Sequence, residues 1–157
     1  MDSQSEGTAD SDLDRIAEKL QQELWSGYSK AVIDHAQNPR NVGQIENPDG
    51  YASVTGSCGD TIQMWVRVSQ GIVKEITFWT DGCGTTIAAG SATTELVKGK
   101  EVQMVMKITA IDVLNALEGL PEENQHCALL AADTLGKVMK DFLTNKSQPW
   151  KRLYPKR

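Results

Sequence analysis

Three cysteines and the histidine beside the last of them are the residues of this chain whose chemistry is most informative. They are Cys58, Cys83, His126 and Cys127. Glycines flank Cys83 on both sides and follow Cys58, and glycine allows the tight turns that hold a sulfur atom at a loop tip. Three thiolates, an imidazole and the carboxylate of Asp60 form one soft-plus-hard ligand set that suits iron or zinc if the loops converge.

The spacing of these donors leaves more than one chemistry open. It matches neither a C-x-x-C zinc ribbon nor a P-loop nor a nucleophile elbow. A metal site is favoured over a thiol enzyme or sulfurtransferase, in which His126 would serve as the base for Cys127. A structural zinc protein is the third reading. Because a carboxylate binds iron more weakly than a thiolate, Asp60 suits a site that holds metal or a cluster transiently.

The ends of the expected elements explain how the donors could meet. Cys58 and Asp60 are two residues apart at the mouth of a strand, so their side chains should emerge on the same side. Cys83 should begin one helix and Cys127 another, and the N-terminus of a helix favours a thiolate. The second histidine, His35, is expected to be a helix residue without a metal role.

Alternating apolar residues predict a small antiparallel sheet. Its strands cover residues 51–55, 62–68 and 73–79, and a three-residue loop, 69–71, joins the last two. Ile76 and Phe78 should face the core, with Val73 on the opposite face beside the tryptophans. We expect Trp65 and Trp79 to pack beneath the N-terminal helices rather than to form a partner interface.

Helical periodicity covers most of the remaining sequence. Helices are predicted over residues 12–24, 28–37, 84–94, 109–117 and 125–143. The small residues of 84–94 should let that helix lie close to its neighbour. The expected organisation is a disordered acidic N-terminus at 1–11, a helical extension at 12–26, a single domain at 27–145 and a basic tail at 146–157.

Charge and cysteine usage exclude several classes of protein. The formal net charge is -5, and residues 1–25 carry all of it, with seven acids against two bases. The rest of the chain has no net charge, so the sequence predicts no basic surface for binding nucleic acid. An odd number of widely spaced cysteines, with no apolar signal or spanning segment, predicts a protein of the reducing cytoplasm with no membrane partner.

The residues closely resemble the IscU/NifU-type scaffold proteins of iron-sulfur cluster assembly. The resemblance runs from Tyr28 to about Phe142 and rests on four motifs in a fixed order. These are Asn38-Pro39-Arg40-Asn41-Val42-Gly43, Cys58-Gly59-Asp60, Gly82-Cys83-Gly84 followed by Ile87-Ala88, and His126-Cys127 leading Leu130-Ala131.

The resemblance implies a fold and a function together. The fold would be α+β, a three-stranded antiparallel sheet packed by helices, with the metal site at one exposed end. The function would be a scaffold rather than an enzyme, assembling a labile [2Fe-2S] cluster and passing it to recipient apoproteins. A [4Fe-4S] cluster shared in a homodimer is the alternative, and zinc could occupy the site after purification.

By the same resemblance, each site residue and each partner has a role. The thiolates of Cys58, Cys83 and Cys127 would bind the cluster, with Asp60 and His126 as exchangeable ligands. A cysteine desulfurase would deliver persulfide sulfur to Cys127, Fe²⁺ would bind at Asp60 and its neighbours, and an electron donor such as ferredoxin would reduce the sulfur. The loop at residues 38–43 resembles the segment with which the family docks its desulfurase.

The sequence departs from particular branches of the family. Residues 120–125 read Leu-Pro-Glu-Glu-Asn-Gln, where the bacterial IscU branch carries a Leu-Pro-Pro-Val-Lys chaperone motif. Asn124 therefore replaces a lysine, which removes a cation near the thiols. The presence of His126 is unlike the SufU branch, and no cysteine follows Cys127 for the extra cluster domain of longer NifU proteins.

Overall fold

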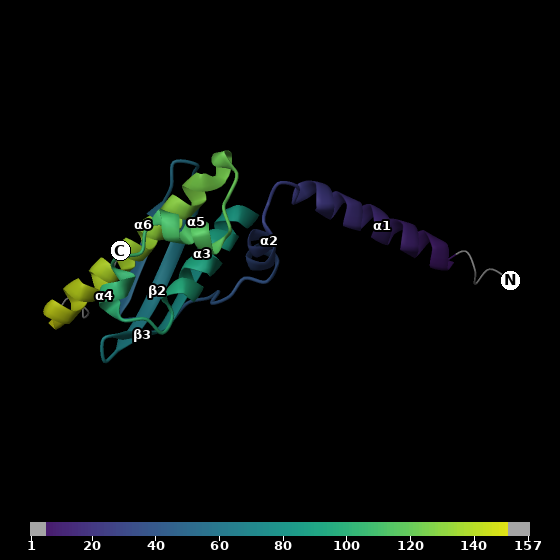
Figure 1. The fold of residues 1–157 in the computed structure, drawn as a ribbon. Coiled ribbons are helices and arrows are strands. Elements are labelled where there is room, and N and C mark those ends of the chain that lie inside the picture. The colour runs from purple at the N-terminus through teal and green to yellow at the C-terminus, as the bar shows by residue number, and fades with distance from the viewer. Residues whose placement is uncertain (1–5, 151–157) are drawn as a thin grey trace.

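A computed structural model describes residues 6–150 of the chain. Two helices precede a sheet, and further helices follow it (Figure 1). The helices are α1 (Glu6–Leu24), α2 (Lys30–Gln37), α3 (Gly84–Val97), α4 (Val102–Val105), α5 (Ala110–Ala116) and α6 (Gln125–Ser147), with a 3-10 turn at Glu122–Asn124; the strands are β1 (Gly50–Thr55), β2 (Thr61–Ser69) and β3 (Ile72–Thr80). The predicted fold class, a three-stranded antiparallel sheet packed by helices, is confirmed.

The strands follow one another in the order β1-β2-β3, and a tight turn joins the last two. Ser69 pairs with Ile72, so the loop has two residues, Gln70 and Gly71, rather than the predicted three. Their φ angles are 54° and 74°. Two consecutive positive φ angles are typical of the turn that matches the twist of a hairpin, and glycine adopts such an angle at little cost.

A β-bulge changes which residues of β3 enter the core. The register shifts between Arg67 and Val68, and Val68 pairs with Val73 while Lys74 is passed over. The extra residue turns Val73 to the core face, where it is fully buried with Ile76. The expectation that Val73 lies on the opposite face was wrong, because strict alternation does not survive a bulge.

Helices α3 and α6 pack on one face of the sheet, α6 along β1 and β2 and α3 along β3. The small residues of α3 allow the close approach that the sequence predicts. A Cβ atom on Gly90 would lie 2.6 Å from ring atoms of Phe78, so only glycine fits there. The helix thereby brings its first turn, and Cys83 before it, to the end of the sheet.

The tryptophans lie on the other face, and α1 does not cover them. Trp65 is 7% exposed and packs against Tyr51, with ring centroids 5.4 Å apart. Trp79 remains 43% exposed. Because the described side chains of α1 are exposed and α2 packs on α3, the expectation that the N-terminal helices cover both tryptophans was wrong.

Helix α1 extends away from the rest of the molecule (Figure 1). It begins at Glu6, six residues before the predicted start at residue 12, so the structure assigns helix to residues 6–11 as well. Carboxylates in the first turns stabilise the N-terminal end of a helix dipole and favour this earlier start. Residues 1–5, and the predicted basic tail beyond residue 150, lie outside the described residues.

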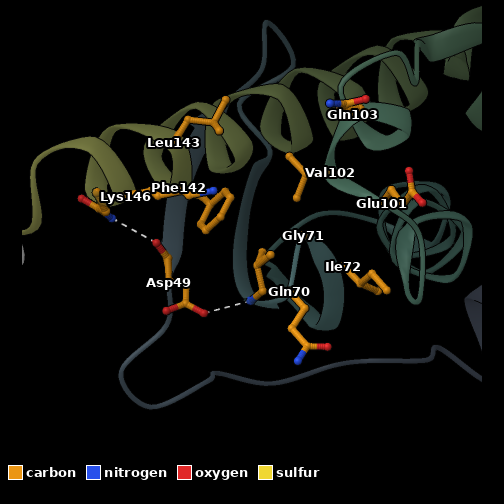
Figure 2. A pocket seen from close by; sticks show the side chains of 12 residues that line it. Asp49, Gln70, Gly71, Ile72, Glu101, Val102, Gln103, Phe142, Leu143 and Lys146 are labelled. Atoms are coloured by element: carbon orange, nitrogen blue, oxygen red, sulfur yellow. Dashed lines mark hydrogen bonds between the residues drawn. The ribbon is translucent and has the colours of Figure 1, made fainter.

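A cavity of about 740 Å³ lies beside the β2–β3 hairpin, between the end of α6 and the segment around α4 (Figure 2). The short helix α4 was not anticipated from the sequence. Within residues 6–150, no helix combines the length and the apolar character needed to cross a membrane.

Candidate functional site

The predicted donors lie where the β1–β2 loop, the β3–α3 turn and the start of α6 come together. Hydrogen bonds fix the first two loops to each other. The amide of Thr61 donates to Asp81 at 2.8 Å, and the hydroxyl of Thr80 donates to the carbonyl of Thr61 at 2.6 Å. Gly59 has a φ of 87°, which glycine adopts without strain, and this lets the loop turn sharply between Cys58 and Asp60.

Thr86, which was not among the residues predicted from the sequence, links the predicted donors. Its hydroxyl donates to a carboxylate oxygen of Asp60 at 2.8 Å and lies 3.7 Å from the sulfur of Cys83 and 3.5 Å from that of Cys127. The ring Nε2 of His126 lies 3.6 Å from the sulfur of Cys127. The three-residue step from Cys83 to Thr86 in one helical turn was the signal that could have found it.

Gly82 permits this close arrangement. A Cβ atom there would lie 2.8 Å from a carboxylate oxygen of Asp60 and 2.7 Å from the Cβ of Thr86. Any side chain at this position would push the β3–α3 turn away from the β1–β2 loop. The glycine before Cys83 therefore serves close approach of the two loops.

The two thiols at helix starts differ in their acidity. Partial burial raises the pKa of Cys83, but hydrogen bonds from the backbone and side chains of Thr86 and Thr85 outweigh it and hold the pKa below 9.0. Burial, with the negative charges of Cys83, Cys58 and Asp60, raises the pKa of Cys127 to about 11. Cys83 is exposed and Cys127 is 1% exposed, so the exposed thiol is also the more acidic one.

The donors surround a common region without sharing one coordination point. Within residues 6–150, no three His, Cys, Asp or Glu side chains are placed to hold one metal ion. Cys58 is exposed in its loop, and His126 is half-exposed. Binding one metal centre through all the predicted ligands therefore requires side chains to reorient.

Two aromatic residues just after α1 contact the surroundings of this site. Trp25 approaches Gly84 so closely that a Cβ there would lie 2.9 Å from its ring. Trp25 and Tyr28 meet edge to face, with centroids 5.5 Å apart. The side-chain amide of Asn124 donates to the hydroxyl of Tyr28 at 2.7 Å, which ties the start of α6 to the chain before α2.

We expect Thr86→Val to raise the pKa of Cys83 towards 9.0, because valine keeps the volume but removes a hydroxyl that can turn its one hydrogen from Asp60 to the Cys83 thiolate. The alkylation rate of Cys83 at neutral pH should fall at least about twofold. The measurement is iodoacetamide labelling against pH in a Cys58→Ser background. Thr93→Val, which removes a buried hydroxyl elsewhere in α3, is the control. An unchanged pH profile for Thr86→Val would refute the role of its hydroxyl.

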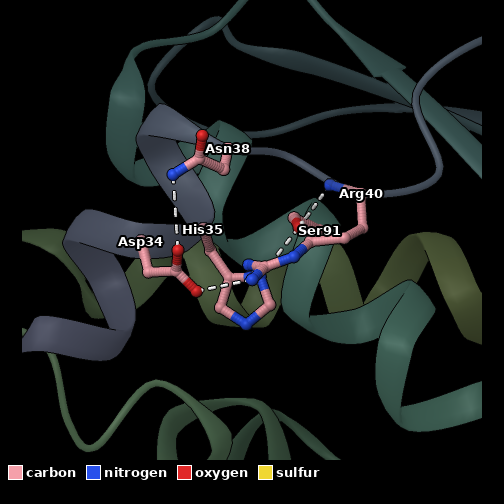
Figure 3. Close-up of polar contacts among 5 residues, drawn as sticks. All are labelled: Asp34, His35, Asn38, Arg40 and Ser91. Carbon is pink, nitrogen blue, oxygen red and sulfur yellow. Dashed lines mark hydrogen bonds and ion pairs between the residues drawn. The ribbon is translucent and has the colours of Figure 1, made fainter.

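A second polar network holds the loop at residues 38–43 against α2 and α3 (Figure 3). The guanidinium of Arg40 donates to Asp34 at 2.6 Å and lies 3.1 Å from Nδ1 of His35. The buried hydroxyl of Ser91 lies 2.8 Å from the same nitrogen and accepts the amide of Arg40 at 2.9 Å. Since a guanidinium only donates, Nδ1 of His35 must be an acceptor, which requires the neutral ring.

The same loop runs alongside β3. The amide of Phe78 donates to the carbonyl of Asn41 at 2.9 Å, and the amide of Gly43 donates to the carbonyl of Phe78 at 3.0 Å. Asn41, at a φ of 61°, also donates its side-chain amide to Thr94 and Glu95. The loop is therefore fixed to the sheet as well as to the helices.

The neutral state of His35 predicts a pH dependence of stability. Burial, foremost, and then the charge of Arg40 lower the pKa of His35 from 6.5, against the opposing charges of Asp34 and Glu95. When the pKa of a base is lower in the folded than in the unfolded state, the unfolded state takes up the proton first as the pH falls. The free energy of unfolding is therefore highest above the unfolded pKa and decreases as the pH falls through the folded pKa. The urea midpoint should therefore fall below about pH 6.5.

His35→Gln should flatten that part of the pH profile, since glutamine offers an acceptor oxygen and does not titrate. The pKa of Asp34 is lowered from 3.8 by its hydrogen bond with Arg40, so its own loss of stabilisation falls at more acidic pH. A parallel loss of stability in wild type and His35→Gln between pH 6.5 and 5 would show that His35 is not responsible.

The fold and the site together define the class of protein: a small α+β protein with free thiols and a carboxylate gathered at one end of a three-stranded sheet. A family model described as NifU-like N terminal domain matches residues 27–149. The chain therefore belongs to the NifU-like N-terminal family, and the resemblance predicted from its motifs is confirmed.

Relatives with assigned names support this membership. Iron-sulfur cluster assembly scaffold protein IscU 1 of Archaeoglobus fulgidus is 44% identical over 116 residues, which covers 73% of this chain and 76% of that protein. Iron-sulfur cluster assembly scaffold protein IscU of Escherichia coli K12 is 39% identical over 124 residues, covering 76% of this chain and 96% of that protein.

Two solved structures share the fold. A putative iron-sulfur cluster assembly scaffold protein for the SUF system from Fervidobacterium islandicum superposes with a TM-score of 0.62 at 21% identity, covering 71% of this chain and 96% of that one. A NifU-like N-terminal protein from Brucella abortus gives a TM-score of 0.60 at 18% identity, covering 74% and 94%.

Proposed function

We propose that this protein is a scaffold for the de novo assembly of iron-sulfur clusters and not a turnover enzyme. Cys58, Cys83 and Cys127 bind a labile [2Fe-2S] cluster as thiolates, and Asp60 and His126 are its exchangeable ligands. The cluster is cargo that the protein passes to recipient apoproteins. Membership of the family and the names of its relatives support this function.

The observation that carries the proposal is the contact of one hydroxyl, that of Thr86, with three of the proposed ligands. Residues from three separate parts of the chain, Asp60, Cys83 and Cys127, meet there. Thiolates are soft ligands and the carboxylate is a hard one, so the set accepts both iron and, in the absence of a cluster, Zn²⁺.

Sulfur arrives, in this proposal, from a cysteine desulfurase that carries a persulfide. The thiolate of Cys127 attacks the outer sulfur of that persulfide, so a new S–S bond forms on Cys127 and the desulfurase leaves as a thiolate. Two electrons from a donor such as ferredoxin then reduce the transferred sulfur to sulfide, which combines with Fe²⁺ held at Asp60 and its neighbours.

The burial of Cys127 sets a condition on this transfer. A thiol that is 1% exposed with a pKa of about 11 reacts slowly, because the thiolate is the nucleophile. Docking of the desulfurase must therefore open the site and favour deprotonation. We propose that the desulfurase docks at the loop of residues 38–43. The hydrogen bonds of Arg40 with Asp34, His35 and Ser91 hold this loop in place.

The three free cysteines suit a reducing cytoplasm, where thiolates persist. Three thiolates per chain also leave a [4Fe-4S] cluster shared by a homodimer as the alternative cargo.

Anaerobic reconstitution tests the function. The folded protein is incubated with Fe²⁺ and either sulfide or a desulfurase with cysteine, and the visible absorption of bound cluster is followed. Serine variants of each cysteine serve as comparisons, and circular dichroism verifies their folding. Cluster absorption on the wild type that is lost from all three variants supports the proposal, and absence of absorption on folded wild type refutes it.

A further inference from the structure

Helix α1 carries an apolar stripe that the rest of the described chain leaves exposed. Leu13, Ile16, Leu20 and Leu24 recur at helical spacing and are 55 to 73% exposed. We call them the α1 stripe. An isolated helix of 19 residues is marginal in water unless an apolar face is buried, so the stripe calls for a partner. The family match begins at residue 27 and leaves this helix outside it.

A groove lies beside the β2–β3 hairpin, at the end of the sheet away from the thiols. Its apolar lining comes from Val68, Ile72, Val102, Phe142 and Leu143, which surround the cavity of about 740 Å³ (Figure 2). We call it the hairpin groove. Leu143 is 40% exposed. An apolar groove of this kind is a typical receptor for one face of an amphipathic helix.

Helix α1 and the segments that border the groove carry opposite net charge. Helix α1 contains six acids and two bases. The groove itself is lined by Asp49, Glu101 and Lys146. The two bordering segments, residues 98–107 and residues 137–146, each have three lysines and one acid in the sequence. Two α1 helices would repel each other, whereas an α1 helix beside the groove places opposite charges together.

The stripe cannot reach the groove of its own chain. Trp25, directly after α1, contacts Gly84 at the thiol end of the sheet. The groove lies at the hairpin end, and the nine residues of β3 between the two ends span about 30 Å. Leu20 is only about 7.5 Å from Trp25 along a helix. The occupant must therefore come from another molecule.

We propose that the α1 stripe of one molecule docks in the hairpin groove of a second copy of this chain. The contact joins unlike surfaces, so it closes only as a reciprocal pair or a ring. Neither surface includes a cysteine. This inference does not depend on the proposed cluster chemistry.

The test is the molar mass of the full-length protein by sedimentation equilibrium over a range of concentrations. We expect a mass above the 17.2 kDa of the monomer that rises with concentration and falls when salt is added. Leu20→Glu and Leu143→Glu should each raise the dissociation constant at least about tenfold. Gln22→Glu, on the opposite face of α1, and Leu129→Glu, an exposed leucine elsewhere on α6, are the matched controls.

Mixing the variants gives the sharper result. The Leu20→Glu protein retains an intact groove and the Leu143→Glu protein an intact stripe, so their equimolar mixture should associate more tightly than either variant alone. A wild type that stays monomeric at all concentrations overturns the proposal. Association lost in Leu20→Glu but kept in Leu143→Glu also overturns it, because the stripe would then bind another surface.

Discussion

Cys127→Ser is expected to abolish persulfide capture from a cysteine desulfurase. A serine hydroxyl cannot form the S–S bond by which the outer sulfur is received, so no sulfur should be added at this position. The measurement is intact-protein and peptide mass spectrometry after incubation with a desulfurase and cysteine. When no desulfurase is docked, the Cys127 thiol of the wild type should react slowly, because Cys127 is buried and its pKa is raised.

The control for this prediction is Cys83→Ser, which alters the exposed and more acidic thiol. It should still carry the added sulfur on Cys127. If sulfur is instead found on Cys83 in the Cys127→Ser protein and is lost in Cys83→Ser, the first receiver is Cys83. Cys127→Ala, which places no hydroxyl in the buried position, separates loss of chemistry from disturbed packing.

Asp60→Ala is expected to slow the loss of an assembled cluster by about tenfold. The carboxylate is the weakest and most exchangeable member of the proposed ligand set, and it draws water towards the metal. The measurement is the decay of visible absorption after anaerobic reconstitution, with and without a chelator. The matched control is Glu123→Ala, which removes an exposed carboxylate just before α6.

Equal or faster decay in Asp60→Ala would contradict the assigned role of this carboxylate. The hydrogen bond from Thr86 to Asp60 gives a further comparison. Thr86→Val leaves the carboxylate in place without its donor, so it should not reproduce the slow decay of Asp60→Ala.

The fold was largely predictable because its signals are local. Alternation of apolar and polar residues predicted the strands, and Asn38 and Pro39 predicted the end of α2. The capping residue Thr109 and the small residues around Gly90 likewise have their effects within one or two turns of their own helices. The bulge that buries Val73 was not predictable, because it depends on how two strands align and not on either strand alone.

The site was predictable to a lesser degree. Glycine-flanked cysteines marked the loops, and Asp60, Cys83 and Cys127 do meet around one hydroxyl. Thr86 was not predicted as a site residue, because a threonine within a run of small residues is usually explained by close packing of the helix. The different acidities of Cys83 and Cys127 depend on burial, which only the assembled structure provides.

The sequence also indicated the apolar stripe of α1 but not its exposure. Periodicity shows that Ile16 and Leu20 share a face, and the usual expectation is that such a face packs on the same chain. The contact between Trp25 and Gly84 fixes the end of the helix at the thiol site. That contact, with the hairpin groove at the other end of β3, keeps the stripe from reaching the groove of its own chain.

The most direct test of the central claim is transfer of an assembled cluster to an apo-ferredoxin. The reconstituted protein is separated from free iron and sulfide, mixed anaerobically with the apo-ferredoxin, and the circular dichroism of the acceptor's cluster is followed with a chelator present. A scaffold whose ligand set is labile should convert the acceptor to its holo form despite the chelator. A cluster that forms but stays on this protein, or that reaches the acceptor only as free iron and sulfide, would contradict the account.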